Sequence, residues 1–123
     1  MTQRLTLRIS FYRMYNGRKA YLVFRKQGVN FRIAVRNPLP FIGDLQQLAR
    51  SAEAGGRIDF SCELDGCRGN AWRFAVMLVN DAVDLRLEPV VGNEGMAGKR
   101  FEWGGGPAVF TAAIYYLTNA MKG

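Results

Sequence analysis

The chain has 123 residues, of which 49% are hydrophobic and 22% are charged, and its net charge is +7. This size and composition indicate one globular domain with a single core and argue against disorder. The longest apolar runs, such as AVMLV (75–79), are too short to span a membrane. The sequence contains no histidine, which excludes Ser-His and Cys-His nucleophilic catalysis and most transition-metal sites.

The N-terminal sequence and the cysteine content bear on cellular location. MTQRLTLRIS (1–10) has no apolar block and no small-residue cleavage site, so a signal peptide is not expected. The two cysteines are too few for a secreted disulfide scaffold. A cytoplasmic protein is therefore expected.

Positive charge is concentrated in the first third of the chain. Residues 1–36 contain nine Lys or Arg and no Asp or Glu, which gives +9. Residues 37–123 contain the remaining eight basic residues and all ten acidic residues, which gives −2. The net charge of the protein therefore arises from one segment.

Residues 4–36 alternate apolar and polar side chains with the period of two that is typical of half-buried strands. Two-residue turns are expected at Asn16-Gly17 and at Gln27-Gly28. Both turns pair apolar residues with apolar residues and give the same inward face. The predicted pairs are Ile9 with Phe24, Phe11 with Leu22, Leu22 with Ile33 and Phe24 with Phe31. The segment is therefore predicted to be a three-stranded antiparallel meander.

The same register fixes the outward face of the meander. Arg8 falls opposite Arg25, and Tyr12 falls opposite Tyr21. Like charges directly opposite each other destabilise a sheet by a few tenths to about 1 kcal/mol, and no acid in this segment can relieve the pair. The candidate partner-binding residues on this face are Arg8, Tyr12, Tyr21, Arg25, Arg32 and Arg36.

A helix is expected between the loop sequence NPLP (37–40) and Gly55-Gly56. Its apolar residues recur with the spacing of one helical face, at Leu45, Leu48, Ala49 and Ala52. This stripe is expected to cover the inner face of the meander.

The strand pattern then recurs at 58–64, 72–78 and 83–87. A two-residue turn at Asn80-Asp81 pairs the last two of these strands, with Val76 opposite Leu85. A three-residue loop between the first two is expected to place Phe60 opposite Trp72. The outward face would then carry a charge-compensated row of Asp59, Arg73 and Glu88.

The C-terminal part is predicted to contain a short strand at 101–103 and a final helix that begins at Pro107. The glycine-rich segment GNEGMAG (92–98) lies between the strand expected at 83–87 and this short strand. The predicted buried stripe of the helix is Phe110, Ala113, Ile114, Leu117 and Met121. GGGP (104–107) lacks the Lys-Ser/Thr of a P-loop, so a flexible connection is favoured over an anion site.

These elements predict an α+β protein of two successive antiparallel meander-plus-helix units, βββα and then βββ(β)α. The helices are expected to pack on one face of the sheet or sheets. A single domain is expected over 1–123, with pseudo-repeat halves 1–56 and 57–123.

No residue pattern indicates an active site. Cys62 points inward on its strand and Cys67 lies in a turn, so a core role for Cys62 is favoured over a thiol pair or zinc site. The acids that can be placed lie beside arginines on a strand face, which suits structure better than acid–base catalysis. No enzyme activity, cofactor, metal or small-molecule substrate is expected.

The basic face leaves three interpretations open. The first is a solvated Arg-rich surface with no partner, or one that meets an acidic loop of the chain itself, such as that of Asp44 or Glu94. The second is a face that docks on an acidic protein, since Arg and Tyr are enriched at interface hot spots. In size and lack of motifs, the chain resembles bacterial inhibitor, toxin-immunity and anti-defence proteins. Docking on an acidic protein is favoured over the third interpretation, which is binding of single-stranded nucleic acid.

The third interpretation is a single-stranded nucleic-acid binder. The tandem sheet-then-helix order resembles the architecture of Whirly and PUR-type proteins, whose exposed sheets carry basic and aromatic residues. The resemblance implies that Tyr12 and Tyr21 stack on bases while Arg8, Arg25 and Arg32 hold phosphates.

Overall fold

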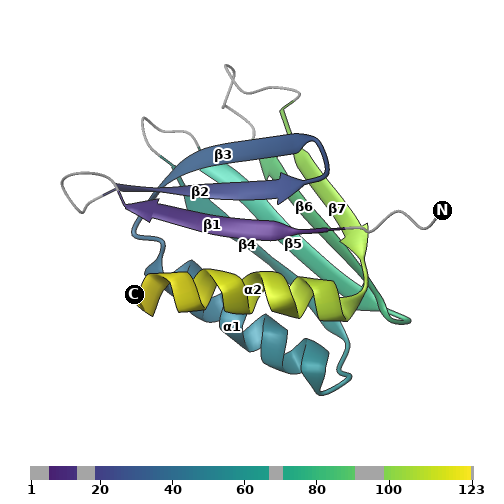
Figure 1. The fold of residues 1–123 in the computed structure, drawn as a ribbon. Helices are drawn as coiled ribbons and strands as arrows, with labels where there is room; N and C mark the ends of the chain where they lie inside the picture. Colours follow the sequence, from purple (N-terminus) through teal and green to yellow (C-terminus); the bar gives the residue numbers. More distant parts are fainter. Residues whose placement is uncertain (1–5, 14–18, 67–70, 91–98, 123) are drawn as a thin grey trace.

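The computed structural model describes residues 6–13, 19–66, 71–90 and 99–122, and this part contains two antiparallel sheets and two helices (Figure 1). The first unit comprises β1 (Arg8–Arg13), β2 (Lys19–Lys26), β3 (Val29–Arg36) and α1 (Leu39–Glu53). The second comprises β4 (Ile58–Asp65), β5 (Ala71–Val79), β6 (Ala82–Pro89), β7 (Phe101–Gly105) and α2 (Pro107–Lys122). Strand order follows chain order in both sheets. The α+β class and the order βββα–ββββα are thus confirmed.

The predicted register of the first sheet is confirmed throughout. Leu22 lies opposite Phe11 and Ile33, and Arg25 lies opposite Arg8. The turn between β2 and β3 relies on Gly28, whose φ of 73° suits a residue without a Cβ. The predicted turn at residues 16–17 lies outside the described residues.

The two sheets pack face to face across an aromatic core. In Figure 1, β1–β3 lie obliquely across one face of β4–β7. The ring centre of Phe24 lies 6.3 Å from that of Phe74 and 5.7 Å from that of Phe101. Phe31 meets Trp72 edge to face at 5.5 Å. Burial of each such side chain contributes about 1.5–3 kcal/mol, so the inner face of the meander is stabilised by the second sheet.

The helices lie beside the meander, on the same face of the second sheet (Figure 1). α1 packs against α2 and β4, and the ring of Phe41 lies edge to face with Phe74 at 4.8 Å. The expectation that α1 covers the meander is therefore wrong, because the rings of the second sheet occupy that face. α1 begins after Pro38, and Gly55 follows its end with a φ of 75°. The helix thus ends where the glycine pair predicts.

The register between β4 and β5 differs from the prediction by four residues. Trp72 lies opposite Leu64, and Phe60 lies opposite Val76. The connection is therefore longer than three residues, and the row of charges on the outward face is Glu63, Arg73 and Glu88. Asp59 lies instead opposite Met77. A shift by an even number leaves every side chain on its predicted face.

The turn between β5 and β6 confirms the predicted pairing of Val76 with Leu85. Asn80 and Asp81 both adopt positive φ, 53° and 61°. This is the backbone conformation of a type I′ hairpin turn, whose twist matches that of the flanking strands.

The C-terminal unit completes the core. β7 pairs with β6, and the side chains of Phe101 and Trp103 are buried. A Cβ on Gly105 would lie 2.5 Å from the Trp103 ring, so only glycine fits there. The predicted stripe of α2 is buried at Phe110, Ala113, Ile114 and Leu117. The side chains of Cys67 and Met121 and the segment 92–98 lie outside the described part.

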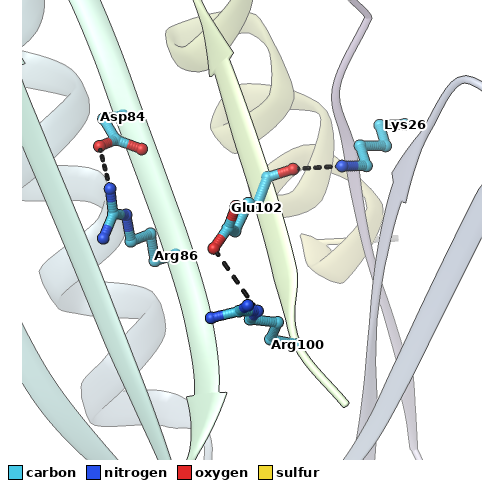
Figure 2. Close-up of polar contacts among 5 residues, drawn as sticks. All are labelled: Lys26, Asp84, Arg86, Arg100 and Glu102. Carbon is cyan, nitrogen blue, oxygen red and sulfur yellow. Dashed lines mark hydrogen bonds and ion pairs between the residues drawn. The ribbon is translucent and has the colours of Figure 1, made fainter. Parts of the chain in front are cut away.

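Two contacts join the sheets at their margins. Val35 of β3 forms an isolated bridge with Gly66, just after β4. At another margin, the Lys26 ammonium donates a hydrogen bond to the backbone oxygen of Glu102 on β7 (Figure 2).

Neither of the two described helices has the length and hydropathy that a bilayer crossing requires.

Candidate functional site

The outer face of β1–β3 carries five of the six predicted site residues in three rows, and the sixth, Arg36, lies opposite Lys19 in a fourth. Pairing across β1 and β2 aligns Arg8 with Arg25, Ser10 with Val23, and Tyr12 with Tyr21. Pairing of β2 with β3 adds Asn30, Arg32 and Ala34 to the ends of these rows. We refer to this surface, defined by Arg8, Tyr12, Tyr21, Arg25, Arg32 and Arg36, as the Arg/Tyr face.

Each of three arginines on this face contacts a different tyrosine. The Arg25 guanidinium donates a hydrogen bond to the Tyr12 hydroxyl at 3.4 Å. The guanidinium carbon of Arg32 lies 4.8 Å from the centre of the Tyr21 ring. That of Arg8 lies 4.9 Å from the centre of the Tyr116 ring, on α2. A cation over a ring is stabilised by about 0.5–1 kcal/mol at an exposed site.

The centre of the Arg/Tyr face is closed to solvent by its own long side chains. Ser10 and Val23 are buried although they point outward. They lie between Arg25 and Tyr12, whose hydrogen bond spans them. The Nε of Arg25 is buried and makes no hydrogen bond within the described part of the chain. One donor of this guanidinium is thus left without an acceptor.

No carboxylate forms an ion pair with the Arg/Tyr face among the described residues. The ion pairs of this part of the chain all lie in the second unit: Arg73 with Glu63 at 3.9 Å, Arg86 with Asp84 at 3.3 Å and Arg100 with Glu102 at 3.7 Å (Figure 2 shows the last two). The two sheets therefore treat their outward arginines differently. Arg73 and Arg86 of the second sheet meet carboxylates, whereas Arg8, Arg25 and Arg32 of the first meet tyrosines.

The structure brings five of the six predicted site residues into this set of contacts. Arg36 is exposed at the far end of β3 and takes part in none of the contacts above. Sequence reasoning missed Tyr116, which is 49% exposed and joins the face from α2. The signal available was its spacing of four and eight residues from Ala112 and Ala108 on one stripe of the helix, but the sequence does not show that this stripe borders β1.

Other reactive groups in the described residues do not assemble into a site. No group of three or more His, Cys, Asp and Glu there could hold a metal ion. Burial, with a smaller effect of Asp44, raises the pKa of the Cys62 thiol to about 11, so the nucleophilic thiolate is scarce at neutral pH. The Tyr115 pKa is raised chiefly by its hydrogen bond with Glu53 on α1, and this contact joins the two helices.

Comparison of the chain with protein-family models, with curated proteins and with solved structures finds no match. The geometry of the Arg/Tyr face is therefore the basis for a functional assignment.

Proposed function

We propose that this is a non-catalytic binding protein that docks its Arg/Tyr face on an acidic surface of another protein. The observation that carries the proposal is the Arg8–Arg25 pair. These cations are direct cross-strand neighbours, and no carboxylate pairs with either in the described residues. An acidic partner would turn this repulsion into attraction and would steer association.

The tyrosines support a protein partner. Tyr12 is 48% exposed, and Tyr21 is half-buried beside it. Tyrosine and arginine are the residue types that often dominate binding energy at interfaces. The arginines are also held by their tyrosine contacts, which lowers the entropy lost when a partner orders them. An inhibitor-like or immunity-like role fits a face of this kind, because such proteins act by covering a surface.

The contacts of the tyrosines weigh against a platform for nucleic-acid bases. Stacking of bases needs free ring faces, whereas Arg32 lies over the Tyr21 ring. Val23 and Ala34 also interrupt the aromatic surface on the same face. Single-stranded nucleic acid is therefore the second candidate, and the test below includes it.

The test begins with the absorbance ratio at 260 and 280 nm of protein purified at low salt, before and after a wash in 1 M salt. The protein is then immobilised, exposed to a nuclease-treated lysate of the cells that encode it, and the retained proteins are identified. Each retained protein is purified and titrated calorimetrically. An acidic protein should bind the wild type.

Two charge-matched variants show whether binding in the titration depends on the Arg/Tyr face or only on net charge. Arg8→Glu/Arg32→Glu reverses two charges on the Arg/Tyr face and should weaken binding at least about 30-fold, the loss of one hot spot. Arg50→Glu/Arg57→Glu changes the net charge equally at exposed positions on and after α1 and should stay within about threefold. Equal losses in both variants would contradict the proposal. Salt-stripped nucleic acid, with affinity that falls steeply with salt, would establish the second candidate instead.

A further inference from the structure

An open groove of about 770 Å³ lies where α2 borders the ends of β1 and β2. Its lining is mostly apolar and includes small and aliphatic side chains, namely Leu7, Ala108, Val109, Ala112 and Ala113. Arg8, Arg25 and Lys26 line it together with Tyr116. The groove is thus an apolar depression with cations around it, at one end of the Arg/Tyr face.

The charges around the groove have one sign. No acidic residue is among the described residues that line it. The Lys26 ammonium donates to the Glu102 backbone oxygen, which carries no full charge. Arg8 rests over the Tyr116 ring, and a ring supplies no acceptor atom in the plane of the guanidinium donors. The positive charge at this rim is therefore available to an anion.

The groove and the Arg/Tyr face are continuous, because Arg8 and Arg25 belong to both. Interface hot spots are buried apolar or aromatic anchors surrounded by polar contacts that exclude water. A mostly apolar lining that also contains arginines can receive an anchor of this kind. The two guanidinium groups in this lining match carboxylates that flank an apolar side chain.

We infer that the groove receives an apolar side chain, flanked by Asp or Glu, from a protruding segment of the acidic partner. This inference rests on the proposed function and adds to it the chemistry of the partner segment. The flanking carboxylates bind Arg8 and Arg25, and the apolar side chain lies on Leu7, Val109 and Ala112.

The test uses two probe peptides of ten residues and ¹H–¹⁵N NMR titrations of the full chain. One peptide has a central Leu-Phe pair flanked on both sides by Asp and Glu, and the other has Ser-Ser in place of Leu-Phe. The Leu-Phe peptide should bind at least tenfold more tightly and should shift the amide signals of Leu7, Ala112 and Val109.

Ala112→Trp fills the groove from an exposed position of α2, and Asn119→Trp adds the same side chain at an exposed α2 position outside its lining. Ala112→Trp should remove the preference for Leu-Phe, so that both peptides bind as the Ser-Ser peptide does. Asn119→Trp should keep the preference. Dispersed amide spectra of both variants show that each is folded.

The outcomes separate this inference from the proposed function. Equal affinity of the two peptides for the wild type, or a preference that survives in Ala112→Trp, would overturn the groove assignment and leave docking on an acidic surface intact. A third peptide, with Lys in place of every Asp and Glu, should not bind. If it binds as tightly as the acidic Leu-Phe peptide, or if no peptide causes shifts at millimolar concentration, the inference is wrong. The proposed function is then judged on the partner titration.

Discussion

Arginine–tyrosine contacts replace ion pairs on the outward face of β1–β3. Arg8, Arg25 and Arg32 each have a tyrosine neighbour, whereas Arg73 on the other sheet lies between two glutamates. A tyrosine holds a guanidinium in place without neutralising its charge. The face is therefore ordered and still positively charged, which is a suitable state for binding an anion.

The Arg8–Arg25 pair should show a repulsive coupling in a double-mutant cycle. With Arg8→Gln and Arg25→Gln, the double variant should be less stable than the sum of the two single effects implies, by a few tenths to about 1 kcal/mol. Urea denaturation at 50 mM salt measures this, and 1 M salt should reduce the coupling. The matched cycle of Glu63→Gln and Arg73→Gln should give the opposite sign. Absence of coupling between Arg8 and Arg25 at low salt would contradict the expectation that these two facing charges repel each other.

The Cys62 thiol should be unreactive in the folded protein. Its pKa is raised from 9.0 to about 11, so at pH 8 its thiolate fraction is about 100-fold lower than in the unfolded chain. In a Cys67→Ser background, N-ethylmaleimide should therefore react about 100-fold more slowly in native buffer than in guanidinium chloride.

The same shift gives stability a pH dependence with a definite sign. Because the folded pKa lies above the unfolded one, the contribution of Cys62 is complete below about pH 9 and is lost as the pH rises to about 11. Cys62→Ser in the same background should remove this part of the decline. Equal alkylation rates in the folded and unfolded states would show that the thiol is not protected.

Among the elements, the β5–β6 hairpin has a turn whose second residue, Asp81, adopts a left-handed backbone conformation that favours glycine. Asp81 has a φ of 61°, and a left-handed conformation costs an L-residue roughly 1–2 kcal/mol relative to the right-handed one. Asp81→Gly should raise the free energy of unfolding by a few tenths to about 1 kcal/mol in urea denaturation.

Gly28→Ala is the converse control, since its φ is 73° and a Cβ there meets nothing within 4 Å. It should lose about 1 kcal/mol. Destabilisation by Asp81→Gly would mean that the carboxylate has a role of its own.

The elements also show what the sequence can and cannot predict. The two-residue turns expected from the sequence predict the register of β1–β3 and of β5–β6 correctly, because such a turn leaves no freedom in pairing. The β4–β5 connection has no such turn. The hydrophobic pattern there is satisfied equally by Trp72 opposite Phe60 or opposite Leu64, since the two registers differ by an even number.

Placement of elements against one another is less predictable still. The stripe of α1 shows which side chains are buried, but it does not show that Phe41 packs on Phe74 and leaves the meander to the other sheet. For the same reason, the groove and Tyr116 are not apparent in the sequence, although Arg8 and Arg25 are. A periodic pattern identifies a buried face, and the partner of that face depends on how the layers stack.

At the scale of the whole molecule, the aromatic contacts between sheets should make the two units unfold together. Phe24 is fully buried and meets rings of the second unit, so Phe24→Ala should cost about 3–5 kcal/mol. Both tryptophans lie in the second unit. Their fluorescence should therefore follow the same urea transition as far-UV circular dichroism, in the wild type and in the variant.

The control is Met77→Ala on the outward face of the second sheet, where the side chain is 45% exposed. It should change stability by less than about 0.5 kcal/mol. A circular dichroism transition that precedes the fluorescence transition would show that the halves unfold independently, against the expectation of a single domain.

The contact between Lys26 and Glu102 has a consequence for how molecules behave at high concentration. β7 is the last strand of its sheet, and an edge strand offers unpaired backbone groups to the strands of other molecules. Lys26 already occupies the Glu102 oxygen and places a positive charge there. A second copy approaching this edge must displace the ammonium and meet its charge. The lysine thus disfavours strand pairing between molecules at the Glu102 position of the β7 edge.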